Sequence, residues 1–260
     1  MSTLLNLHLT KGSNVGDIES GPYRYFSEKV PEIDLSDAHP DVINGADLVL
    51  GGGGLLIFSN VLYEIYKNRI GRLVVWGVGL NDHSKQYDDS FPPWIGEADL
   101  IGVRDWGKGY RWVPCASCMS PLFDREYDVK HDVVAYLRAD GWDKDARTVL
   151  AGFPRLFNTA LLKEVIAFLG SGQTVVMTSY HGAYWASLLG RKVIVWNPFS
   201  SRFYSMRHPP LLLQEVDTIG IDVIKQAVAY PNALQECRIA NTAFYSDVTT
   251  LLGNLTAVER

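Results

Sequence analysis

The fold is indicated most clearly at residues 174–186, where the sequence reads TVVMTSYHGAYWA. The first five residues, each of them apolar or β-branched, are typical of a buried strand. Hydroxyl residues and a histidine follow, and Gly182 then forms a turn that opens a helix. Strand, turn and helix in this order are the repeating unit of α/β proteins with parallel strands.

Short β-type runs of the same kind recur on both sides of this segment, and each ends in glycine or a polar turn. The expected strands form two series, at 4–9, 47–50, 73–77 and 100–103, and at 133–137, 174–178 and 193–196. Apolar residues three or four apart predict helices at 161–169 and 237–251.

The segment 112–130, with two prolines and a charged stretch, separates the two series. We therefore predict an α/β fold of two Rossmann-like domains, residues 1–125 and 126–260, that face a cleft, with a C-terminal helix closing the chain. Ligands of such sheets bind beyond the carboxyl ends of the strands.

Composition restricts the partners. The 260 residues carry a net charge of -5 and contain no basic block that could follow a phosphate backbone, so we expect no nucleic-acid partner. The longest apolar stretch, 48–58, is interrupted by glycines and falls short of the roughly 20 residues that cross a bilayer. Residues 1–10 lack the pattern of a signal peptide.

Three cysteines, an odd number, suit a reducing compartment, and the C-x-x-C of Cys115 and Cys118 is best interpreted as buried thiols. We expect a cytoplasmic protein, with the inner face of the membrane as an alternative location.

Candidate binding residues lie after the expected strands of the first series. In the motif KGSNVGD, residues 11–17, Asn14 and Gly16 could approach a ligand and Asp17 could act as a general base. The alternative is a glycine turn with Asp17 as a helix cap. The run 51–54, four glycines that include Gly52 and Gly53, could present N–H groups to an anion or simply let the chain turn under a neighbouring loop.

Arg104 ends the last strand of this series and could bind an anionic donor, although an Arg beside an Asp is also typical of a structural ion pair. The pair Gly77 and Gly79 lacks the third glycine of a dinucleotide-binding fingerprint.

The candidate catalytic and donor-binding residues follow the strands of the second series. His181 lies at a turn beside a helix N-terminus, a position suited to an anion, and histidine ordinarily titrates near neutral pH. The loop NPFSSRF, residues 197–203, follows the next strand and supplies two hydroxyls and a guanidinium, although an ordinary surface loop is the alternative. The expected donor-binding residues are Ser179, Tyr180, Gly182, Asn197, Ser200, Ser201 and Arg202.

Taken in order, these motifs resemble the polysaccharide pyruvyltransferase family over nearly the whole chain. The matching elements are Asn14-x-Gly16-Asp17, Gly51 to Gly54, Gly77-x-Gly79, Val103-Arg104-Asp105, Ser179-Tyr180-His181-Gly182 with Ala186 and Leu189-Gly190, and Arg238-x-x-Asn241-x-x-Phe244. The resemblance implies a GT-B-like pair of domains that moves pyruvate from phosphoenolpyruvate onto a sugar as a ketal, with release of phosphate.

On this resemblance His181 is the general acid, Asp17 the base, and Arg104 and Arg202 neutralise the donor. Residues 1–125 form the acceptor side, with Asn14, Gly16, Gly52 and Gly53, and residues 126–260 form the phosphoenolpyruvate side. The acceptor would be a free, nucleotide-linked or lipid-linked sugar of a bacterial-type surface polysaccharide or its precursor. The scheme needs no metal and no cofactor.

One position departs from the family. Many members have an arginine two residues before the motif histidine, where this chain has Ser179. Arg202, Arg104 and Arg207 are the candidates to replace that charge, with Arg202 first.

Two other functions fit the same architecture: a GT-B glycosyltransferase that uses a nucleotide sugar, and a non-catalytic sugar-binding protein.

Overall fold

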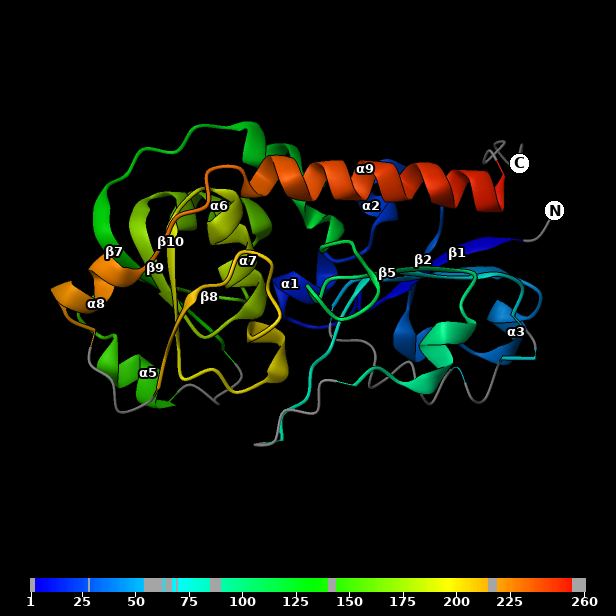
Figure 1. The fold of residues 1–260 in the computed structure, drawn as a ribbon, viewed down its shortest axis with the longest axis horizontal. Coiled ribbons are helices and arrows are strands. Elements are labelled where there is room, and N and C mark those ends of the chain that lie inside the picture. Colours follow the sequence, from blue (N-terminus) through cyan, green and yellow to red (C-terminus); the bar gives the residue numbers. More distant parts are fainter. Residues whose placement is uncertain are drawn as a thin grey trace. The chain divides into compact units, whose positions relative to one another are not determined.

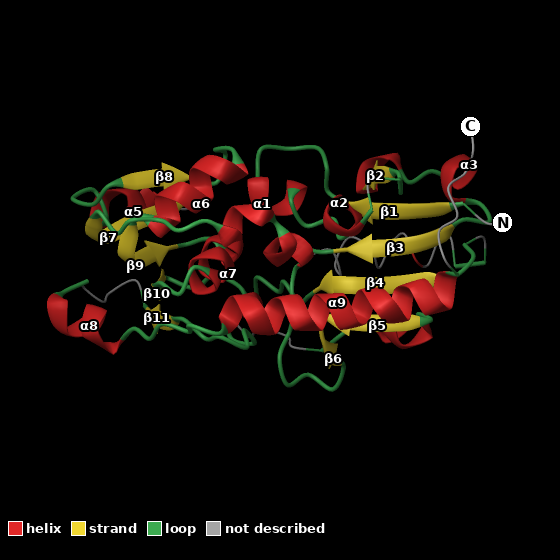
Figure 2. Cartoon of the chain, turned by 90° about the horizontal axis from the view of Figure 1, so that it is seen from above, coloured by secondary structure: helices red, strands yellow, loops and turns green. Residues whose placement is uncertain are grey.

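The computed structural model describes residues 3–27, 29–53, 63, 67–68, 70–84, 90–139, 144–214 and 219–253. Over this part the protein is a mixed α/β structure with two parallel sheets (Figures 1 and 2). It divides into two compact units. The first unit comprises Met1–Gly12, Asp17–Ser117 and Cys237–Arg260, and the second comprises Ser13–Gly16 and Cys118–Glu236.

The first unit contains a sheet of order β2-β1-β3-β4-β5-β6. Its strands are β1 (Leu4–His8), β2 (Glu32–Asp34), β3 (Asp47–Gly51), β4 (Leu73–Val78), β5 (Leu100–Val103) and β6 (Arg111–Trp112). The four strands predicted in this region are confirmed as β1, β3, β4 and β5. The edge strands β2 and β6 were not predicted, because three and two residues are too few to show a period.

The second unit contains a sheet of order β11-β10-β9-β7-β8. Its strands are β7 (His131–Leu137), β8 (Arg155–Phe157), β9 (Gly172–Met177), β10 (Lys192–Trp196) and β11 (Leu211–Leu213). The predictions at 133–137, 174–178 and 193–196 correspond to β7, β9 and β10. All strand pairs of both sheets are parallel, as expected.

Among the described residues, helices lie between the strands of each sheet, and two more follow the last strand. They are α1 (Val15–Ile18), α2 (Tyr23–Phe26), α3 (Pro40–Ile43), α5 (Lys144–Val149), α6 (Leu162–Gly170), α7 (Tyr180–Leu188), α8 (Ile221–Gln226) and α9 (Ala233–Leu252). Short 3-10 turns are η1 (Leu35–Asp37), η2 (Pro93–Glu97), η3 (Ala116–Met119), η4 (Pro121–Asp124) and η5 (Ser201–Phe203). The helices predicted at 161–169 and 237–251 are α6 and α9. No helix of the described residues combines the length and hydropathy that a membrane span requires.

The first sheet is buried on both faces, as parallel sheets generally are. On one face Leu5 and Leu7 of β1 pack with leucines and valines of β3 and β4. On the other face Trp76 of β4 packs with Tyr23 of α2 and Phe244 of α9. This double burial explains why the central strands are such clear apolar runs in the sequence.

Helix α9 lies along the first sheet over β4 and β5 (Figure 2). Phe244 and Val248 are fully buried, and Asn241 accepts a hydrogen bond from the Trp76 indole at 2.8 Å. Contacts place the helix from Cys237 onward in the first unit. The chain therefore returns to its first sheet, and a single cut near residue 125 does not describe its units.

Loops of the first unit are fixed by Asp34, which is 4% exposed. Its carboxylate accepts hydrogen bonds from the backbone N–H groups of Ser36, Lys11 and Thr10 at 2.7 to 2.9 Å. Burial opposes ionisation, but these hydrogen bonds outweigh it and hold the pKa of Asp34 well below its ordinary value.

Candidate functional site

The candidate site lies at the carboxyl edge of the second sheet, where each strand delivers a polar residue. Arg138 follows β7, Asn158 follows β8, Thr178 and Ser179 follow β9, and Asn197 follows β10. Adjacent ends are tied together, because the Arg138 N–H donates to Thr178 Oγ1 at 3.3 Å. In parallel sheets this edge is where ligands bind.

His181 lies in the first turn of α7. Ser179 is the N-cap of this helix, and its Oγ accepts a hydrogen bond from the Gly182 N–H at 3.4 Å. The His181 side chain is 5% exposed and packs near the rings of Tyr180 and Trp185, with centroids at 5.5 and 5.4 Å. The predicted strand and helix are confirmed, but the helix already begins at Tyr180. Gly182 therefore lies inside the helix, and the chain turns at Thr178 and Ser179 instead. The surrounding rings hold the imidazole in a nearly closed environment.

The loop Ser13–Gly16 belongs to the second unit and packs on His181. A Cβ atom added to Gly16 would lie 2.2 Å from His181 Nδ1, so only glycine allows this approach. Asn14 fixes the loop: its Oδ1 accepts hydrogen bonds from the Gly16 N–H and from Asn158 Nδ2, both at 3.2 Å. The Asn158 carbonyl accepts a further bond from the Val15 N–H at 2.9 Å. Residues 14–16 of the motif are thus packed against the histidine or hydrogen-bonded to its surroundings.

Asn158 is the residue that joins these parts. It is 7% exposed, and its Oδ1 also accepts a hydrogen bond from the Ala139 N–H at 2.9 Å. Its side chain therefore bridges the segment after β7 and the Asn14 loop. The sequence analysis did not select it, because one asparagine after a short strand forms no motif; its position directly after β8 is the only signal.

Two guanidinium groups lie against the ring of Phe199. The Cζ atom of Arg138 is 4.1 Å from the ring centroid, and that of Arg202 is 4.9 Å. Arg202 lies in the turn η5. Ser200 caps this turn, because its Oγ accepts a hydrogen bond from the Arg202 N–H at 3.4 Å. Ser200 and Ser201 are buried, and Asn197 adopts a left-handed backbone with φ of 51°. The edge therefore holds two guanidinium groups against one aromatic ring, and guanidinium groups are suited to binding carboxylates and phosphates.

Arg138 was also missed by the sequence analysis, whereas Arg202 was selected. Arg207, another expected candidate for the missing charge, forms an ion pair with Glu236 at 2.8 Å, and His208 reaches the same carboxylate at 3.3 Å. The hydrogen bond from Arg207 outweighs burial and lowers the pKa of Glu236. The Arg207 guanidinium is therefore paired with the Glu236 carboxylate.

The remaining expected residues lie in the first unit. Arg104 is 2% exposed, donates from Nη2 to the Leu80 carbonyl at 3.1 Å, and packs so closely on Gly79 that a Cβ there would lie 2.4 Å from the Arg104 side chain. Asp105 accepts from the Leu80 N–H at 2.9 Å. Both residues therefore make contacts with the backbone of Leu80.

The glycine run and Asp17 also belong to the first unit. Gly52 and Gly53 have positive φ values of 60° and 71°, and a Cβ on Gly52 would lie 2.3 Å from Ser20. The run thus turns beneath a neighbouring loop; Gly54 lies outside the described residues. Asp17 follows Gly16 directly in the sequence, and its carbonyl accepts a hydrogen bond from Ser20 Oγ at 2.6 Å.

Cys115 and Cys118 are buried as predicted, and Cys237 is buried as well, each at 0% exposure. Burial raises the pKa of the Cys115 thiol. Among the described residues there is no group of three or more metal-ligating side chains.

No protein-family model matches the chain, and no curated protein matches it. Among solved structures it is similar to an uncharacterized protein from Klebsiella pneumoniae subsp. pneumoniae NTUH-K2044, at a TM-score of 0.46 and 16% identity. That alignment covers 75% of this chain and 83% of the other.

Proposed function

We propose that the chain transfers pyruvate from phosphoenolpyruvate to two hydroxyls of a sugar, forming a ketal and releasing phosphate. The observation that carries the proposal is the pair of guanidiniums, Arg138 and Arg202, that lie against Phe199 at the same sheet edge as His181. Phosphoenolpyruvate carries a phosphate and a carboxylate, and two planar cations suit these two groups. In this scheme Arg138, together with Arg202, supplies the charge that is absent at Ser179.

The chemistry needs an acid, a base and charge neutralisation. His181 protonates C3 of the donor while a sugar hydroxyl attacks C2 and gives its proton to Asp17. Phosphate then leaves C2 with the electrons of its C–O bond, and the second hydroxyl closes the ketal and releases its own proton. The placement of His181 is supported by its burial among rings, and the role of Asp17 is the one that the family resemblance implies.

The proposal includes the GT-B-like arrangement of two Rossmann-type domains that the family resemblance implies. The acceptor is a sugar in free, nucleotide-linked or lipid-linked form. Seryl hydroxyls at 179, 200 and 201 would hydrogen-bond the donor oxygens, and the N-terminus of α7 would favour its negative charge.

A mass-spectrometric screen tests the reaction. Phosphoenolpyruvate is offered with a panel of free, nucleotide-linked and lipid-linked sugars, and the expected product is a sugar with the fixed mass of one pyruvyl ketal together with an equivalent of phosphate. His181→Ala should abolish turnover and leave the circular-dichroism spectrum unchanged. Product formation at the wild-type rate by this variant would remove His181 from the mechanism.

Arg138→Gln gives a second test, with Arg155→Gln as its matched control. Arg155 begins β8, so it lies at the opposite edge of the same sheet.

Protection against thermal unfolding distinguishes the glycosyltransferase alternative: phosphoenolpyruvate should raise the melting temperature, whereas stabilisation by a nucleoside diphosphate alone would favour a nucleotide-sugar enzyme.

A further inference from the structure

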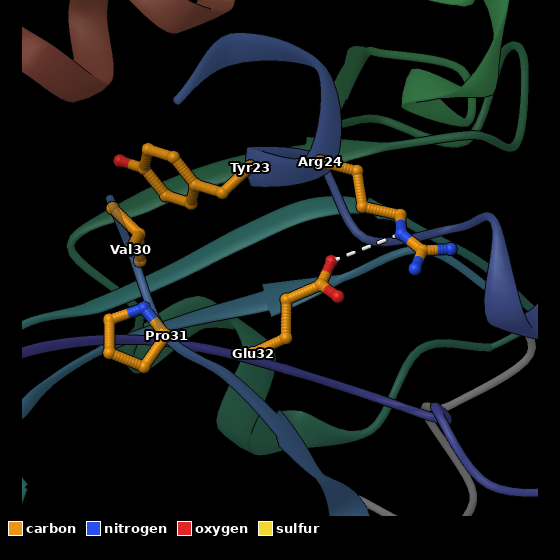
Figure 3. A pocket seen from close by; sticks show the side chains of 5 residues that line it. All are labelled: Tyr23, Arg24, Val30, Pro31 and Glu32. Atoms are coloured by element: carbon orange, nitrogen blue, oxygen red, sulfur yellow. Dashed lines mark ion pairs between the residues drawn. The ribbon is translucent and has the colours of Figure 1, made fainter. Parts of the chain in front are cut away.

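A cavity of about 390 Å³ lies in the first unit beside α2 and the edge strand β2, and it is lined by Tyr23, Arg24, Val30, Pro31 and Glu32. Figure 3 shows its two sides: Tyr23, Val30 and Pro31 on one, and the facing Arg24 and Glu32 side chains on the other. The cavity is large enough for a single sugar ring and is built entirely from the first unit.

The carboxylate of Glu32 is fixed from behind. Its Oε1 atom lies 3.3 Å from His8 Nε2 and 3.3 Å from Arg24 Nε. His8 is fully buried and its Nδ1 faces the Asp17 carbonyl at 3.4 Å, so the ring is held from both sides. Burial opposes ionisation of Glu32, but the interactions with His8 and Arg24 outweigh it and lower its pKa.

This geometry leaves one acceptor and one donor group side by side. Arg24 Nη1 is occupied by the Ile18 carbonyl at 3.0 Å and by Glu19 at 3.3 Å. Within the described part of the chain, neither Glu32 Oε2 nor Arg24 Nη2 takes part in a hydrogen bond or ion pair. A carboxylate oxygen next to a guanidinium N–H₂ matches two neighbouring hydroxyls, one of which donates while the other accepts.

A second polar side chain in this region also lacks partners. Asn6 is opposite Glu32 in the register of β1 and β2 and is fully buried. Neither its Oδ1 nor its Nδ2 atom has a hydrogen-bond partner among the described residues. Buried amide groups normally form hydrogen bonds. The Asn6 side chain therefore leaves a donor and an acceptor in this part of the sheet without a partner among the described residues.

We propose that this cavity binds a neutral pyranose, with two adjacent hydroxyls on Glu32 and Arg24 and the C–H face of the ring against Val30 and Pro31. The charges favour a neutral ligand over an ion, because Arg24 is already balanced by two carboxylates, Glu19 and Glu32. The site does not depend on the proposed transfer of pyruvate, since a sugar can bind here whether or not the chain is an enzyme.

Saturation-transfer NMR with the full chain tests this site, using methyl pyranosides of glucose, galactose, mannose and N-acetylglucosamine as probes. At least one should bind at millimolar concentration, and Glu32→Gln and Arg24→Gln should each weaken it about tenfold or more, as loss of a hydrogen bond to a charged group does. Lys11→Gln, which removes an exposed ion pair with Asp37 in the same unit, should leave binding unchanged.

Arg24→Gln keeps the test decisive if Glu32→Gln fails to fold, because the Arg24 side chain is partly exposed. The proposal is overturned if no pyranoside binds, or if binding is the same in folded Arg24→Gln as in the wild type. It is also overturned if inorganic phosphate binds and Arg24→Gln abolishes that binding, because the cavity would then be an anion site.

Discussion

Gly16→Ala is the sharpest perturbation of the candidate site. The added Cβ would lie 2.2 Å from His181 Nδ1, against at least 3.4 Å in ordinary contact, so the loop or the imidazole must move by more than 1 Å. The loop cannot swing away without cost, because Asn14 and Val15 are hydrogen-bonded to Asn158. Overpacking of this kind costs about 1–3 kcal/mol. For a chain of this size each kcal/mol lowers the melting temperature by ~2–4 °C, so we expect a decrease of roughly 2–12 °C.

Two measurements check this expectation. Thermal unfolding followed by circular dichroism gives the stability change, and histidine-labelled NMR spectra should show a shifted resonance for His181, identified by its loss in His181→Gln. The matched control is Gly152→Ala, because a Cβ there has nothing within 4 Å and should alter neither the melting temperature nor the spectrum. If Gly16→Ala has the melting temperature of the wild type and leaves the His181 resonance unshifted, the loop does not pack on the imidazole and the reasoning is refuted.

Three further predictions concern single side chains. Arg138→Gln should raise the KM for phosphoenolpyruvate about tenfold or more in the ketal assay, whereas Arg155→Gln should not; equal values would remove Arg138 from the donor site. Asn158→Ala should lower the melting temperature and shift the His181 resonance together, because it releases the loop of Gly16; a stability loss with an unchanged resonance would contradict the link. Asp34→Asn should destabilise the protein at pH 7, and the difference from the wild type should shrink below about pH 4. The folded pKa of Asp34 is depressed, so its contribution is present above the unfolded pKa and is lost as the pH falls through the folded one. A constant difference across acidic pH, in urea titrations, would count against this.

The sequence predicted the parts of the fold whose physical cause is local. Buried central strands such as β4 and β9 appear as apolar runs, and α6 appears through its period. Strands of three residues, such as β8, carry no such signal. The return of α9 to the first unit also has no local signature, because it depends on contacts between Trp76 and residues more than 160 positions later.

The candidate site also contains residues with a local sequence signal and residues that only long-range contacts bring together. His181 and Ser179 were selected because a strand, a turn and a helix start coincide in one continuous segment. Arg138 and Asn158 could not be selected, since each is a single polar residue whose partners lie on other strands. Sequence motifs found the segment that turns at the sheet edge, and the tertiary structure supplied the side chains around it.

The glycines that carry the family resemblance have a structural explanation that is separate from chemistry. Gly16 is required where the loop meets His181, and Gly52 where the chain turns beneath Ser20. Such positions fix how closely the backbone approaches a neighbouring residue, so a chain can keep them without carrying out the reaction. Substituting polar residues therefore tests function more directly than substituting glycines. If Arg138→Gln and His181→Ala leave both the fold and ketal formation intact, the glycine pattern describes only the architecture; if they abolish turnover in a folded protein, the same pattern positions a catalytic site.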